Sequence, residues 1–177
     1  MRATSLTVTA LAAALLLTAC ADGGDGKDAD SGKDTKAAAT CADQLAVRLG
    51  PANAAPAVGD TGNVTFTVTN RSGAECTLDG GPGFEFDAGS GVTGVALDPA
   101  VTSRKTTFPK EASSSFTVTY VRGEGGGTKS LAVKSAKIRL PGAAEAHSFK
   151  WSYGDVALKS DGKTADASVS GFQQTGD

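Results

Sequence analysis

The sequence predicts an all-β fold in which short antiparallel strands form a sandwich, and three observations lead to this prediction. Apolar and polar residues alternate along Asn63–Asn70, Ser114–Tyr120 and Ser148–Tyr153, as expected for strands with one buried face. Turn-forming residues separate the strands, as at Asn70–Gly73 and Gly80–Gly83. In the same part of the chain, no apolar stripe with helical spacing reaches a useful length.

The strands can be placed in order along the chain. In the first long strand the inward residues are Val64, Phe66 and Val68, with threonines between them, and the second repeats this pattern around Val118. The shorter strand candidates are Leu45–Leu49, Glu75–Leu78, Phe84–Asp87, Val92–Leu97, Ser130–Val133, Lys137–Leu140, Asp155–Lys159 and Ala167–Gly171. Many short strands at regular spacing are typical of an antiparallel sandwich.

The third long strand has aromatic residues at alternate positions, Phe149, Trp151 and Tyr153. Such residues could form a stacking platform for a sugar or part of a sandwich core. Because all three face one side of the predicted strand, we predict that they belong to the core.

Two glycine-rich segments connect predicted strands. Gly89–Gly94 has the spacing of a dinucleotide-binding loop, but such a loop must open a helix at the phosphate, and here Val95–Leu97 continues as strand. We therefore predict a glycine-rich hairpin at this position, a loose hairpin loop at Gly123–Gly127, and no cofactor.

Residues 1–20 have the layout of a secretory signal. Met1-Arg2 is a short positive start, residues 10–17 are apolar, and Leu17-Thr18-Ala19-Cys20 resembles a bacterial lipobox. One alternative is a retained transmembrane helix, but threonines interrupt the apolar run and a bilayer requires about 20 apolar residues. A plain secretion signal followed by a chance cysteine is the other. We expect a signal peptide over residues 1–19 and lipidation of Cys20.

The segment that follows Cys20 has nothing to bury. Residues 21–40 contain no Val, Ile, Leu or aromatic residue, so we predict a disordered tether over residues 20–40 and a β-sandwich domain over residues 41–177. Fatty chains such as palmitate on Cys20 would bind membrane lipid and hold the domain at the outer face of the cytoplasmic membrane.

Cys41 and Cys76 are the two cysteines that remain once Cys20 is lipidated. In an oxidising compartment such a pair is expected to form a disulfide. Two free buried thiols are the alternative.

The charge balance argues against a nucleic-acid partner. The chain has 17 Lys+Arg and 19 Asp+Glu for a net charge of −2, which becomes −3 when the signal peptide takes Arg2 with it. Nucleic-acid binding requires clustered basic charge. The small basic group Lys134, Lys137 and Arg139 is expected to point outward from strands.

No motif assembles a catalytic or metal-binding site. His147 is the single histidine, no Gly-x-Ser-x-Gly segment is present, and no Cys/His spacing suits zinc. We therefore expect no catalytic residues and no metal, with His147 exposed at a strand edge. A hydrolase would require His147 to meet a serine and a carboxylate in one pocket.

The segment Cys76–Gly83, with the sequence CTLDGGPG, resembles the central signature of a family known as domain of unknown function 4232, found in actinobacterial lipoproteins and secreted proteins. The residues after Cys41, the segment Asn63–Gly73 and the closing Val169–Gln173 are also similar, so the resemblance spans residues 41–174. It implies an immunoglobulin-like sandwich and a disulfide between Cys41 and Cys76. It implies no activity.

These observations predict a membrane-anchored, extracytoplasmic lipoprotein. We expect its domain to be a non-catalytic binding or interaction module of the cell envelope, with an envelope protein or a cell-wall polymer as partner. The alternatives are a small hydrolase that acts on envelope polymers and a structural or stress-related envelope protein.

Overall fold

The computed structural model describes residues 40–101 and 105–174. The predicted signal peptide, the lipidation site Cys20 and the tether up to residue 39 lie outside the described residues. Within them, no helix is long and apolar enough to cross a membrane.

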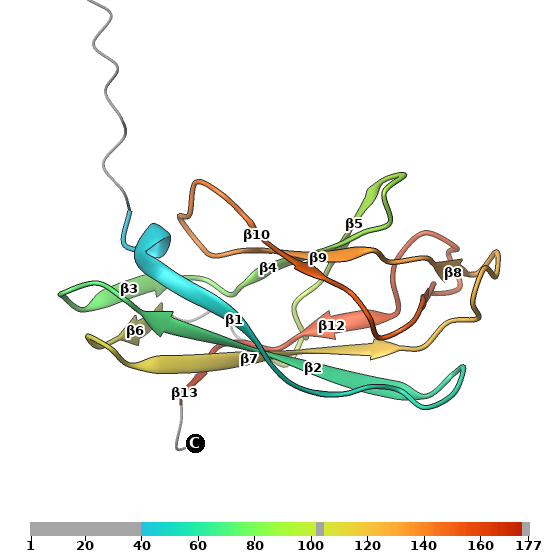
Figure 1. The fold of residues 1–177 in the computed structure, drawn as a ribbon, viewed down its shortest axis with the longest axis horizontal. Helices are drawn as coiled ribbons and strands as arrows, with labels where there is room; N and C mark the ends of the chain where they lie inside the picture. The colour runs from blue at the N-terminus through green and yellow to red at the C-terminus, as the bar shows by residue number, and fades with distance from the viewer. Residues whose placement is uncertain (1–39, 102–104, 175–177) are drawn as a thin grey trace, which may run out of the picture. The chain divides into compact units, whose positions relative to one another are not determined.

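Two antiparallel sheets form the two layers of a sandwich (Figure 1). The larger sheet has the order β1 (Leu45–Asn53), β2 (Thr61–Asn70), β7 (Ser113–Val121) and β12 (Ala167–Val169), with β13 (Gln173–Gln174) also paired to β7. The second sheet has the order β10 (His147–Lys150), β9 (Ser135–Arg139), β4 (Gly83–Asp87) and β5 (Val92–Val95). Two small ribbons pair β8 (Ser130–Leu131) with β11 (Val156–Ala157), and β3 (Cys76–Asp79) with β6 (Lys105–Phe108). The chain is therefore all-β, and the arrangement is consistent with an immunoglobulin-like sandwich.

The register of β2 against β7 builds the centre of the core. Val64 lies opposite Val118 and Phe66 opposite Phe116, and all four side chains are fully buried. The Phe66 ring is 5.3 Å from that of Phe116 and 5.8 Å from that of Phe84 on the second sheet, measured between ring centroids. Phe66 thus joins the two layers, as alternating inward residues of a sandwich do.

Each strand segment predicted from the sequence overlaps a strand, but three details differ. The short strands β6 and β13 were not predicted, because neither Lys105–Phe108 nor Gln173–Gln174 shows a clear apolar alternation. The strand expected over Ser148–Tyr153 ends at Lys150, where the chain bends toward Gly154, a glycine with φ of 85°.

The aromatic residues after β10 belong to the core, as predicted. Trp151 is 5% exposed, and its Nε1 donates a hydrogen bond to the carbonyl of Gly154 at 2.8 Å. Its ring meets those of Phe86, Tyr120 and Tyr153 edge to face. A buried indole with a satisfied N–H is not available as a stacking platform.

The chain enters the sandwich through a segment that is bonded to the β3–β6 ribbon and to the β9–β10 loop. A disulfide joins Cys41 to Cys76, the first residue of β3, with 5.5 Å between their Cα atoms. The Asp43 carboxylate accepts hydrogen bonds from the amide of Ala144, in the β9–β10 loop, and from Thr40. These hydrogen bonds lower the pKa of Asp43. The disulfide confirms the predicted pairing of Cys41 with Cys76.

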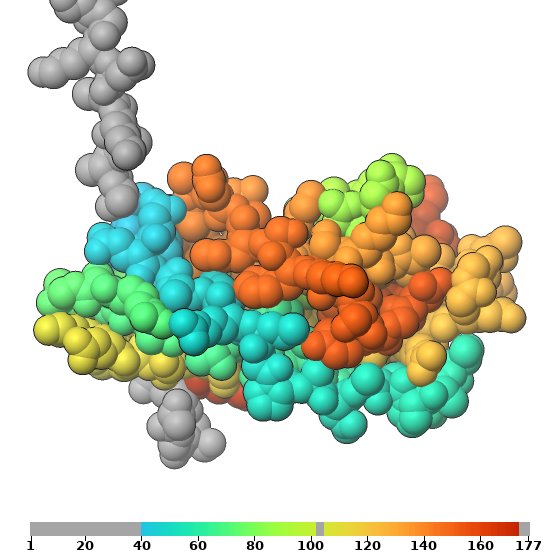
Figure 2. Space-filling model, in the orientation of Figure 1, coloured from blue at the N-terminus to red at the C-terminus, as the bar shows by residue number. Residues whose placement is uncertain are grey.

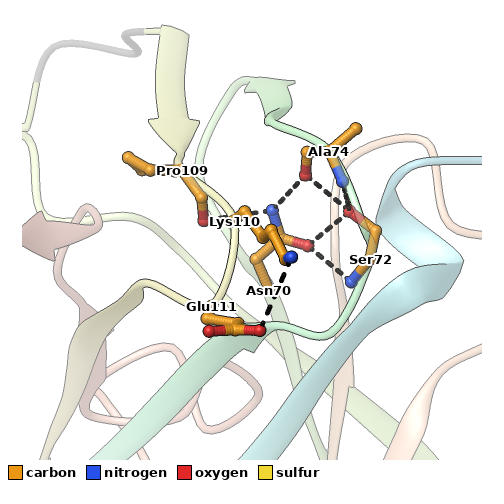
Figure 3. A network of polar contacts seen from close by, with 6 residues as sticks. All are labelled: Asn70, Ser72, Ala74, Pro109, Lys110 and Glu111. Atoms are coloured by element: carbon orange, nitrogen blue, oxygen red, sulfur yellow. Dashed lines mark hydrogen bonds and ion pairs between the residues drawn. The ribbon is translucent and has the colours of Figure 1, made fainter.

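Asn70 organises the turn that follows β2 (Figure 3). Its fully buried side chain donates to the carbonyls of Ala74, Phe108 and Pro109 at 2.8, 2.9 and 3.1 Å, and its Oδ1 accepts from the amide and hydroxyl of Ser72. One side chain thereby ties the β2–β3 turn to the end of β6 and to the residue that follows it, and its own polar atoms are paired although they are buried.

Candidate functional site: a cleft at the loop end of the sandwich

The loops that form the candidate site lie at the end of the sandwich opposite the entry of the chain at Thr40. Because Leu45 of β1 pairs with Asn70 of β2, the β1–β2 loop (residues 54–60) lies at the far end of both strands. The end of β7 and the β7–β8 loop (residues 122–129) lie beside it, since Thr61 pairs with Val121. Strands of nine residues span about 30 Å. In Figure 2 the teal β1–β2 loop and the amber β7–β8 loop lie away from the blue entry residues.

These loops enclose a cleft of about 330 Å³. Its lining residues are Val58, Gly59, Val121, Arg122, Gly123, Glu124, Gly127, Thr128, Lys129, Ser130, Ala157 and Leu158. This volume is at the lower end of the roughly 300–1,000 Å³ typical of small-ligand sites. The cleft is therefore large enough for a small ligand or for a short segment of a larger partner.

The β7–β8 loop is held by hydrogen bonds to Asp155, the residue before β11. The amide of Gly123 donates to the carbonyl of Asp155 at 2.8 Å, and the amide of Gly126 donates to the carboxylate of the same residue at 3.0 Å. A Cβ atom on Gly123 would lie 2.5 Å from the Ser130 hydroxyl oxygen. Glycine is required there because the two segments approach too closely for a side chain.

The opposite wall of the cleft is held by Arg122. Its Nη1 donates to the carbonyls of Ala55 and Pro56 at 2.8 and 3.0 Å, and its own carbonyl accepts from the amide of Gly59 at 2.8 Å. The guanidinium therefore fixes the β1–β2 loop. This loop presents Val58 at the cleft with 62% of its surface exposed.

The side chains at the cleft combine both signs of charge with apolar and hydroxyl groups. Glu124 and Lys129 are exposed, and in the part of the chain that the structure describes neither forms an ion pair. The Glu124 carboxylate lies close to Gly127: a Cβ atom placed on that glycine would be 3.4 Å from Oε2 of Glu124. Val58 and Leu158 supply aliphatic surface. Such a lining can recognise a ligand that has charges, amide groups and a small apolar group.

His147 lies at the other end of the domain, in a cavity beside the chain entry. This cavity, also of about 330 Å³, is lined by Ala42, Asp43, Ala143, Ala144, Glu145, Ala146 and His147. It contains two carboxylates and no serine, and the Asp43 carboxylate is already bonded to backbone amides. The histidine that a hydrolase would use is therefore not brought to a serine here.

The prediction that His147 is exposed was wrong, although it does lie on an edge strand. The residue pairs with the buried Ile138 and so faces the inner side of β10, where it is half-buried. The alternation along β10 assigns it to that face, because Phe149 two residues later contacts the core.

The two glycine-rich segments can also be compared with their predictions. Gly89–Gly94 lies in the hairpin between β4 and β5, as predicted. The Gly123–Gly127 segment is not a hairpin loop, because β7 pairs with β2 and β12 while β8 pairs with β11.

Lys137 and Arg139 point outward from β9, and Lys137 forms an ion pair with Asp87 at 2.8 Å. The hydrogen bond from Lys137, followed by one from the Gly89 amide, lowers the pKa of Asp87. Across the described residues, no group of three potential metal ligands is present.

A family model described as "Domain of unknown function (DUF4232)" matches residues 41–173. The chain belongs to this family. The DUF4232 match begins at Cys41 and includes Cys76 and every residue that lines the cleft. No curated protein and no solved structure matches the chain.

Sequence reasoning did not identify the cleft within this DUF4232 domain. Val58 was in a segment without strand pattern, and Glu124 and Lys129 flank a glycine run that was taken for a hairpin loop. The usable signal was an apolar residue, a carboxylate and an ammonium group in loops rather than on strands, since binding residues are frequently carried by loops.

Proposed function

We propose that this chain is a lipoprotein anchored at the outer face of the cytoplasmic membrane through acylated Cys20, and that its β-sandwich is a non-catalytic binding module of the cell envelope. The observation that supports the binding role is the cleft at the loop end, whose walls are held by hydrogen bonds. Two of its charged side chains, Glu124 and Lys129, form no ion pair within the described residues. A prearranged site of this kind loses little conformational entropy when a ligand binds.

The position of the cleft suits a tethered domain. The chain enters at Thr40, which is bonded to the β9–β10 loop through its hydroxyl and the Gly142 carbonyl at 3.0 Å. The cleft lies at the other end of strands β1 and β7. An anchor that acts through the entry segment therefore leaves the cleft free for an envelope protein or a cell-wall polymer.

The chain offers a matched pair of exposed valines for the test of binding. Val58 lines the cleft and is 62% exposed, whereas Val92 lies on the edge strand β5 and is 50% exposed. We expect Val58→Asp to reduce the amount of envelope partner captured by the mature chain roughly tenfold, because an aliphatic contact is replaced by a charge. Val92→Asp should leave capture unchanged. Equal effects of the two substitutions would contradict the proposal.

The anchor and the absence of catalysis are tested separately. Cys20→Ala should move the full chain from the membrane fraction to the soluble fraction, because the acyl chains are lost. A Cys20→Ala chain that still fractionates with membranes would refute the anchor. Turnover of an envelope polymer that His147→Ala abolishes would contradict the non-catalytic role and favour a hydrolase.

A further inference from the structure

We propose that the cleft binds a short zwitterionic peptide, with a carboxylate of the ligand at Lys129, an ammonium group at Glu124 and an aliphatic side chain against Val58 and Leu158. This inference rests on the proposed binding role of the cleft and specifies the chemical class of its ligand.

The charges of the lining support a ligand with both signs. Lys129 and Glu124 lie at opposite ends of the β7–β8 loop, both side chains are exposed, and neither has an ion-pair partner among residues 40–101 and 105–174. Elsewhere on this end, Asp155 is bonded to the Gly126 amide and Arg122 to two carbonyls, so those charges are already used. A free ammonium group and a free carboxylate on one loop match the two termini of a short peptide.

The rest of the lining favours a peptide over a sugar or a nucleotide. The cleft has no aromatic residue on which a sugar ring or a base could stack. The hydroxyls of Thr128 and Ser130, which also line the cleft, can bond to amide groups. The cleft volume of about 330 Å³ exceeds what a single small amino acid would fill.

Hydrogen bonds within the β7–β8 loop and to Leu158 hold the loop in place. Two successive turns are closed by the bonds from the Gly127 amide to the Glu124 carbonyl at 2.9 Å and from the Ser130 amide to the Gly127 carbonyl at 3.1 Å. The Lys129 carbonyl accepts from the amide of Leu158 at 2.9 Å, which fixes the other end of the loop. Preorganisation of this kind lowers the entropic cost of binding.

The probe is the tripeptide alanyl-valyl-alanine, titrated into the mature chain carrying Cys20→Ala and followed by amide chemical shifts in NMR spectra. We expect shifts at residues 58–59 and 123–130. Blocking either terminus of the peptide, by N-acetylation or by C-amidation, should weaken binding about tenfold, because one charge-assisted hydrogen bond is lost. Free valine should bind more weakly than the tripeptide.

Substitutions then assign each terminus to its residue. Lys129→Gln should weaken the free peptide about tenfold but leave the C-amidated peptide unaffected, and Glu124→Gln should do the same for the free and N-acetylated peptides. Lys163→Gln, in the exposed β11–β12 turn and outside the cleft lining, is the control and should change nothing.

Three results would overturn the peptide proposal: shifts that fall outside the cleft, equal affinity for free and blocked peptides, or free valine binding as tightly as the tripeptide. If the peptide fails while capture of an envelope partner still depends on Val58, the binding role stands and only the ligand class is wrong. If capture also ignores Val58, both are wrong.

Discussion

The substitution Asn70→Asp changes one atom group at the centre of the polar network in Figure 3. The two N–H groups of Asn70 Nδ2 face three carbonyls, those of Ala74, Phe108 and Pro109, so one N–H is shared, while Oδ1 accepts from Ser72. Aspartate has the same shape and keeps the accepting oxygen. The substitution therefore tests the donated hydrogen bonds with little change in packing.

The cost follows from the number of carbonyls that lose a donor. A protonated aspartic acid can donate to one of the three carbonyls, and an ionised carboxylate to none. The Pro109 carbonyl keeps the hydrogen bond from the Ala112 amide, and the Ala74 carbonyl lies 2.6 Å from the Ser72 hydroxyl. The Phe108 carbonyl is therefore the acceptor most affected. A buried acceptor left without a partner costs about 1–3 kcal/mol, so we expect the free energy of unfolding to fall by about 2 kcal/mol at neutral pH.

The deficit should also depend on pH. Burial and the facing carbonyls favour the neutral form, so they raise the pKa of the introduced carboxyl above its unfolded value of about 3.9. The loss is therefore smallest below that unfolded value, and it grows as pH rises from there to the raised folded pKa.

Urea unfolding followed by the fluorescence of the buried Trp151 measures this loss at pH 7 and at pH 4. Asn63→Asp is the matched control, because Asn63 is half-buried and its Oδ1 accepts from the Thr119 hydroxyl at 2.8 Å, which a carboxylate also does. The control should lose less than about 1 kcal/mol. If Asn70→Asp loses no more stability than Asn63→Asp, the network does not hold the turn.

Three further predictions concern stability. Cys76→Ala opens a disulfide with a sequence separation of 35 and should lower the free energy of unfolding by about 4 kcal/mol in the same urea assay; an unchanged midpoint would contradict this. The hydrogen bond from the Thr164 hydroxyl and those from two backbone amides lower the pKa of Asp161 to about 2. This carboxylate contributes stability above its unfolded pKa of about 3.9 that is lost as pH falls toward 2, and Thr164→Val should move its NMR titration midpoint upward. Gly62→Ala places a Cβ atom 2.5 Å from the Tyr120 ring and should cost about 3 kcal/mol, whereas Gly73→Ala meets open space and should cost far less.

The inward faces of the strands could be read from the sequence because side chains alternate with a period of two. Phe66, Phe116 and Trp151 are buried as that alternation predicts. The cysteine pairing was also predictable from the number of cysteines and the expected oxidising compartment, and the disulfide between Cys41 and Cys76 is present.

The weak strands and the edge histidine were less predictable. Lys105–Phe108 forms a strand because it pairs with β3, and its own sequence has no clear alternation of apolar and polar residues. The face of His147 was wrongly predicted because the predicted strand began at Ser148 and did not include it, whereas in the structure His147 pairs with Ile138 and shares the inner face with Phe149.

By itself, the sequence determined the position and the buried face of the strands that alternate clearly, and that the fold is an antiparallel sandwich. Only the tertiary structure decided which strands are neighbours, because an alternation of period two assigns faces within a strand and says nothing about the strand beside it. The pairing of β8 with β11, rather than with β7, brings the loops carrying Val58, Glu124 and Lys129 around one cleft. The candidate site is therefore a product of topology, assembled from loop residues that have no periodic pattern in the chain.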